Sequence, residues 1–120
     1  MSNFSKGYQQ EPNGSKVDEV IGTIVAIVVS QEAERGGKNH EYYDAIGPNA
    51  HEIIAEKGVE ISNASYFSYE TFRADGHFVV VAKALPKSGL NGKVIYESKT
   101  GKWVGSEDIR QELLPEIIDR

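Results

Sequence analysis

The chain has 120 residues, and its 13 basic and 18 acidic side chains give a net charge of −5. That length suits one domain with a single hydrophobic core. The lack of cysteine excludes a disulfide scaffold, a thiolate metal site and a cysteine nucleophile within this chain. The acidic balance disfavours a protein that coats nucleic acid.

The chain divides into a polar arm and one folded domain. Residues 1–15 are polar and carry two glycines and a proline, which predicts a flexible N-terminal arm. Residues 16–120 form the predicted domain. Its most apolar segment, 20–29, is about half as long as a bilayer requires and has charged flanks, so we interpret it as folded core. With no export signal evident, we expect a cytoplasmic protein that does not enter a membrane.

The first half of the domain is predicted to be helical. Apolar residues over 16–35 recur at helical spacing. Most of them are β-branched, which favours a strand, but about twenty residues is too long for an ordinary strand, so we favour a helix. Residues 40–46 are predicted as a short helical turn. A second helix is predicted over 48–57, because Pro48 suits a first helical position and Gly58 a stop.

From residue 64 the hydrophobic period changes to two, which predicts an antiparallel meander. Asp75-Gly76 is a strong hairpin signal. The strand that follows is apolar on both faces and should be central. Ser106 is a suitable N-cap for a last helix over 107–114, which Pro115 should divide from a short terminal piece. The predicted strands cover residues 66–73, 77–85, 93–98 and 103–104.

These elements predict an α+β fold in which helices pack on one face of a curved antiparallel β-sheet of three to five strands. The predicted core comprises the larger apolar side chains on the inner faces of these elements. They are Ile24, Val28, Ile53, Ile54, Phe78, Val80, Ile95, Tyr96, Trp103 and Leu113.

The sequence contains no complete motif for binding a metal ion or a cofactor. The histidines are His40, His51 and His77. His51-Glu52 resembles the start of a zinc-protease helix motif, but Ala55 stands where the second histidine ligand should be. No phosphate-binding glycine loop and no nucleophile elbow occur in the sequence. We therefore predict no metal and no cofactor.

The sequence offers carboxylates and a histidine for acid–base catalysis, but nothing in it fixes their mutual distances. Such a group beside a tyrosine in a sheet-lined cavity could move a proton, although in an acidic protein such groups usually lie on the solvated surface. We therefore expect no enzyme. The alternative of a small-molecule-binding or isomerase-like protein, with a cavity between sheet and helices, stays open. The candidate groups are Glu41, Asp44, His51, Glu52 and Glu70.

Lysines gather in the meander. Residues 77–104 carry five lysines against one acid, Glu97, with Tyr96 and Trp103 among them. Interleaved basic and aromatic residues can bind single-stranded nucleic acid, but lysines also protect sheet edges. The overall charge favours the second explanation, so nucleic acid is not an expected partner.

Three segments carry a family resemblance. They are residues 49–56 (NAHEIIAE), 74–86 (ADGHFVVVAKALP) and 94–102 (VIYESKTGK). Over 49–104 the chain resembles the nuclear-transport-factor-like immunity proteins that accompany bacterial polymorphic toxins. PepSY-like domains share the helix and the Thr-Gly-Lys hairpin.

The resemblance implies a cystatin-like or nuclear-transport-factor-like cone for the fold, with a protein-binding face and no catalytic residues. The leading hypothesis is an immunity protein that neutralises a cognate toxin by occlusion, with acidic side chains facing a basic active site. The expected partner-binding residues are Tyr69, Glu70, Glu97 and Trp103. A self-assembling structural or regulatory module, including a homodimer, stays open as a further alternative.

Overall fold

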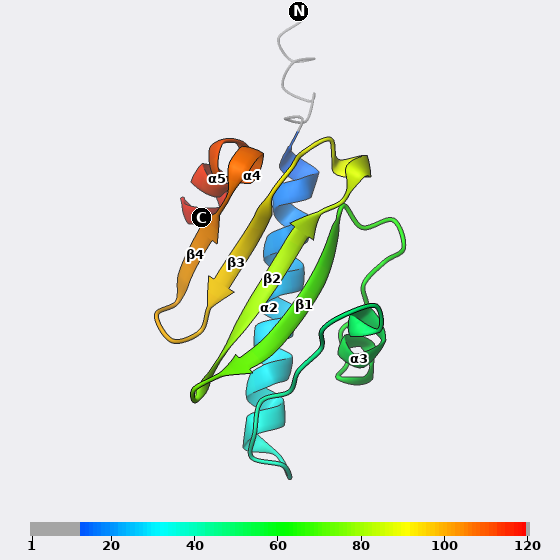
Figure 1. Ribbon diagram of the computed structural model, residues 1–120, viewed down its shortest axis with the longest axis vertical. Coiled ribbons are helices and arrows are strands. Elements are labelled where there is room, and N and C mark those ends of the chain that lie inside the picture. Colours follow the sequence, from blue (N-terminus) through cyan, green and yellow to red (C-terminus); the bar gives the residue numbers. More distant parts are fainter. Residues whose placement is uncertain (1–12, 120) are drawn as a thin grey trace, which may run out of the picture.

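The computed structural model describes residues 13–119 (Figure 1). Its strands form one antiparallel sheet in the order β1-β2-β3-β4, which confirms the α+β class and places the apolar strand β2 inside the sheet. The elements are α2 (Gly14–Gly36), α3 (Ala50–Glu56), β1 (Phe67–Ala74), β2 (His77–Ala84), the 3₁₀ turn η1 (Pro86–Ser88), β3 (Lys93–Glu97), β4 (Lys102–Gly105), α4 (Glu107–Glu112) and α5 (Leu114–Ile118).

The long helix α2 runs along one face of the sheet (Figure 1). This confirms the helix predicted over 16–35. Its fully buried residues Val17, Val20, Ile24 and Ile27 follow the three- and four-residue spacing of a helix face. The β-branched side chains are accommodated because burial of this stripe against the sheet outweighs their weak helix propensity.

The sheet buries every second residue against α2. In β1 the side chains of Phe67, Tyr69 and Thr71 point inward, as the two-residue period of a strand requires. The Asp75-Gly76 hairpin joins β1 to β2 as predicted. Asp75 and Gly76 have φ values of 42° and 81°, the two positive values of a type I′ turn.

The C-terminal helices close one end of the core. Ile109, Leu113 and Ile117 are buried, and α5 contacts both β4 and α2. Pro115 lies in the first turn of α5, so the predicted helix break is confirmed. Ser106 occupies the N-cap position of α4, but its hydroxyl makes no capping bond and accepts the N–H of Lys93 instead.

The prediction of a helical turn at 40–46 is wrong. These residues are irregular and include a single antiparallel bridge, Ala45 to Thr71. The buried amide of Gln31 holds the segment, since it donates to the Tyr43 carbonyl and to the Thr71 hydroxyl and accepts the Tyr43 N–H, each at 2.9 Å. The segment therefore satisfies its backbone groups through its neighbours rather than as a helix.

The predicted core is largely confirmed. Ile24, Ile54, Phe78, Val80 and Leu113 are fully buried. Ile95 is the exception, because it is half-buried on the face of the sheet opposite α2. The predicted N-terminal arm lies, for residues 1–12, outside the described range. No helix of residues 13–119 is long and apolar enough to cross a membrane. Half-buried side chains packed against the core include the predicted Val28, Ile53, Tyr96 and Trp103.

Candidate functional site: the open face of the sheet

The face of the sheet turned away from α2 carries the candidate site. In Figure 1 the strands lie in front of α2, and α3 lies beside β1. The helices of the described chain leave the front of the strands uncovered, and we call this surface the open face. Its side chains are those of Ser68, Glu70, Phe72, Val79, Val81, Lys83, Lys93, Ile95, Glu97, Lys102 and Val104.

The strand register arranges the open face in three cross-strand rows. The first, which we call the donor row, pairs Ser68 with Lys83 and Lys83 with Lys93. The second, the apolar row, runs from Glu70 at the β1 edge through three branched aliphatic side chains. The third mixes apolar and charged groups. The apolar row contains Val81, Ile95 and Val104, and the third row Phe72, Val79, Glu97 and Lys102.

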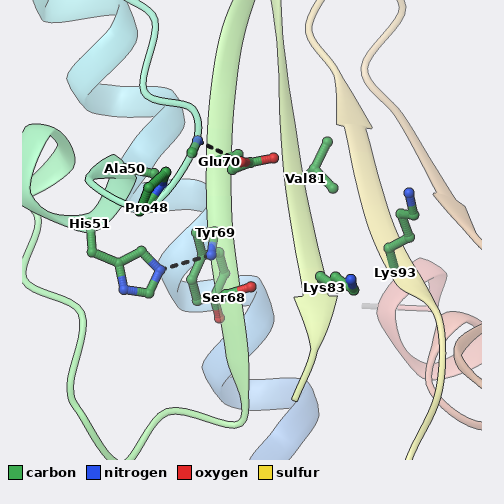
Figure 2. Close-up of a pocket in the computed structure, with 10 residues that line it drawn as sticks. Pro48, Ala50, His51, Ser68, Tyr69, Glu70, Val81, Lys83 and Lys93 are labelled. Carbon is green, nitrogen blue, oxygen red and sulfur yellow. Dashed lines mark hydrogen bonds between the residues drawn. The ribbon is translucent and has the colours of Figure 1, made fainter.

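A pocket of about 530 Å³ opens on this face beside β1. One wall is the segment that leads into α3, with Gly47, Pro48 and His51. The other side is made by the first two rows of the sheet. Figure 2 shows the side chains of the donor row, together with Glu70 and Val81, on the same side of the strands.

Two hydrogen bonds fix the α3 wall to β1. The backbone N–H of Gly47 donates to the Glu70 carboxylate at 2.8 Å, and the backbone N–H of Tyr69 donates to Nε2 of His51 at 2.9 Å (Figure 2). Because Nε2 accepts, the neutral ring carries its proton on Nδ1. His51 and Glu70 are thus used to build the pocket wall.

The outward N–H groups along the edge strand β1 are all used. The outward N–H groups at positions 67, 69, 71 and 73 donate in turn to the Ser65 hydroxyl, to His51, to the Ala45 carbonyl and to the Asp44 carboxylate. Asp44 also pairs with the Arg73 guanidinium at 3.1 Å. The backbone N–H of Arg73, and then its side chain, lower the pKa of Asp44 below its usual value.

The four predicted partner-binding residues do not form one surface. Glu70 and Glu97 share the open face, whereas Trp103 pairs with Tyr96 on the α2 side. Tyr69 is 1% exposed and lies in the core. The reason is geometric, since neighbouring strand residues such as Tyr69 and Glu70 point to opposite faces.

Tyr69 has a structural role instead. Its hydroxyl donates to the carboxylate of Glu19 on α2 at 2.8 Å, and the same carboxylate accepts the N–H of Tyr66 and the hydroxyl of Ser65. Burial is the main cause that raises the pKa of Tyr69 well above 10, opposed by a hydrogen bond with Thr23 and assisted by the Glu19 charge. This cluster ties the loop before β1 to the helix.

The catalytic and metal candidates are scattered. Glu41 and Asp44 both pair with Arg73, whereas His51 and Glu70 line the pocket. No three histidine, aspartate or glutamate side chains within residues 13–119 are grouped to hold a metal ion. The pocket opens on the face away from α2, whereas the predicted cavity of the small-molecule alternative lay between sheet and helices.

Sequence reasoning missed the donor row. Lysine and serine are common surface residues, and they form a site only where the strand register makes them neighbours. The signal that could have found the row is the hairpin register, since the Gly92 turn sets Lys93 opposite Lys83. Alternation alone places each side chain on a face but does not align the strands.

Comparison with known proteins adds no relative. No protein-family model, no curated protein and no solved structure matches this chain.

Proposed function

We propose that this chain is a non-enzymatic protein-binding domain whose partner docks on the open face. The observation that carries the proposal is the apolar row, in which Val81, Ile95 and Val104 lie side by side with no described helix over them. The side chain of Val104 is 45% exposed. A contiguous apolar surface with charged groups around it is typical of protein interaction sites.

The rigidity of the face supports the same proposal. The open face belongs to a hydrogen-bonded sheet whose other side is packed on α2, and its pocket wall is tied down by the Gly47 and Tyr69 hydrogen bonds. A preformed surface loses less conformational entropy on binding than a mobile one. In the more specific form that the family resemblance implies, the domain is a bacterial immunity protein and its partner a toxin.

The test is co-expression with the product of the adjacent gene. We expect rescued growth and a complex of fixed stoichiometry, and we expect the double variant Ile95→Thr/Val104→Glu to lose both. Gln111→Glu, which adds the same charge at an exposed position on α4, should keep both. A neighbouring gene that encodes no toxin, together with no complex, would refute the immunity proposal. A complex unaffected by the double variant would refute docking on the open face.

A second candidate, self-association, is favoured by the outer face of α2. Val25 and Val29 are 47% and 62% exposed on this face, and Gly22 lies one turn before Val25. The middle of α2 is thus apolar on the side away from the sheet as well as on the buried side, and helices that are apolar all round are usually covered on both sides. Light scattering over a range of concentrations tests this. Val25→Glu/Val29→Glu should abolish any dimer, and Ile95→Thr/Val104→Glu should leave it intact.

A further inference from the structure

The donor row contains three side chains with unused hydrogen-bonding capacity. Ser68, Lys83 and Lys93 stand at one level on three adjacent strands. Within residues 13–119 none of the three side chains makes a hydrogen bond or an ion pair. The two lysines are exposed and the serine is half-buried. Lys83 and Lys93 are direct cross-strand partners, an arrangement in which like charges destabilise a sheet.

The acids on the open face are already engaged. Glu70 accepts the Gly47 N–H at 2.8 Å. Glu97 accepts the Thr100 hydroxyl at 3.2 Å and stands directly opposite Lys102 in the register. Within residues 13–119 the lysines of this face, Lys83, Lys93 and Lys102, make no ion pair, and only Lys102 stands opposite an acid in the register. Lys83 and Lys93 therefore form a positive pair that no carboxylate of this face faces across the strands. This pair favours an acidic group in the partner, whereas the acidic side chains of the sequence led us to expect a basic one.

We infer that the donor row binds the carboxylate of an acidic residue in the docked partner, while the apolar row receives an apolar side chain next to it. This inference rests on the proposed function. Ammonium and hydroxyl groups on three strands form the charge-assisted hydrogen bonds that a carboxylate accepts. Charge complementarity of this kind selects partners and accelerates encounter.

The spacing of the two rows defines the partner segment. Lys83 and Val81 are two residues apart on β2, as are Lys93 and Ile95 on β3, so the rows are separated by about 6–7 Å. An extended segment repeats the same step between residues i and i+2. The partner segment thus carries aspartate or glutamate at one position and a large aliphatic residue two positions away.

The experiment titrates the ¹⁵N-labelled chain with a synthetic peptide, acetyl-Thr-Asp-Thr-Leu-Thr-Val-amide, and follows backbone amide shifts by NMR. We expect saturable shifts on β2 and β3 at peptide concentrations up to about 10 mM. The same peptide with asparagine in place of aspartate should bind about tenfold more weakly. Lys83→Gln/Lys93→Gln should lose this preference for aspartate, whereas the matched control Lys38→Gln/Lys99→Gln should keep it.

The outcomes separate this inference from the proposed function. Equal binding of both peptides, or a preference that survives Lys83→Gln/Lys93→Gln, would overturn the carboxylate site and leave docking on the open face intact. Absence of saturable shifts with either peptide would also overturn the inference. Acetate alone producing the same shifts would show a free-anion site and overturn the assignment to a protein segment. The Lys83→Gln/Lys93→Gln variant removes a like-charge pair, so we expect it to be at least as stable as the parent chain, which a urea titration checks.

Discussion

Gly92 is the described glycine at which an added methyl group should lower the free energy of unfolding most. Its φ of +115° is rarely adopted by other residues, and an added Cβ would lie 3.0 Å from the Ser106 carbonyl carbon and closer still to its oxygen. Backbone atoms cannot yield as a flexible side chain can. Gly92→Ala therefore has to push β3 away from the segment that leads into α4.

The cost has two parts. Strained backbone contributes about 1–3 kcal/mol. The shift also disrupts two hydrogen bonds of 3.1 Å, Ser106 N–H to the Lys93 carbonyl and Lys93 N–H to the Ser106 hydroxyl, each contributing about 1 kcal/mol. We expect a loss of about 3–5 kcal/mol. Gly101→Ala is the matched control, since Gly101 also has a positive φ, +72°, but nothing lies within 4 Å of its added Cβ, so the conformational cost alone is about 1–2 kcal/mol.

Urea unfolding followed by circular dichroism measures both variants. With a slope of about 1.5 kcal/mol/M, the midpoint should fall by about 2–3 M for Gly92→Ala and by about 1 M for Gly101→Ala. Equal losses for the two variants would refute the reasoning, because they would mean that the contact with Ser106 costs nothing. Gly92→Ala should also displace Lys93 from the donor row and weaken the preference for an acidic peptide.

Three further predictions test the interior and the covered edge. The Arg73 backbone N–H lowers the pKa of Asp44, so the ionised carboxylate stabilises the folded domain above the ordinary aspartate pKa, and this stabilisation is lost as pH falls through the lowered pKa. Asp44→Asn should therefore flatten the loss of unfolding free energy between about pH 5 and 3. Parallel curves of unfolding free energy against pH for the two proteins would contradict this. The buried phenol of Tyr69 should stay protonated at pH values at which a free tyrosine side chain ionises. ¹³C NMR, with Tyr69→Phe to assign the signal, checks this, and an ordinary titration would contradict it. Gln31→Ala should lower the free energy of unfolding in urea by about 2–4 kcal/mol, because it leaves the buried N–H and carbonyl of Tyr43 without a partner. The control Gln111→Ala should lower it by less than about 0.5 kcal/mol. Equal effects of the two changes would contradict a stabilising role of the buried Gln31 hydrogen bonds.

The local features of the fold were predictable because they depend on neighbours in sequence. Helix α2 was distinguished from a strand by its length, even though its β-branched residues favour a strand. The hairpin turn at Asp75-Gly76 and the helix break just before Pro115 follow from backbone restrictions on single residues. Such signals need no knowledge of which elements lie side by side.

The site depended on pairings that no local pattern contains. Residues 40–46 looked helical, but they bridge to Thr71 and are held by Gln31. The partner-binding prediction combined Tyr69 with Glu70, although alternation already assigns neighbouring strand residues to opposite faces. The two lysines of the donor row became a pair only once the β2–β3 register was known.

The covered edge of β1 determines the direction in which the sheet can be extended. An incoming strand needs unpaired backbone groups, and the outward N–H groups of β1 are taken by Ser65, His51, Ala45 and Asp44. We therefore expect strand exchange, fibril growth or β-strand addition by a peptide to begin at β4, at the opposite end of the sheet. Protection against aggregation is therefore expected to be stronger at β1 than at β4, so a charge added at β4, as in Val104→Glu, should protect the less covered edge.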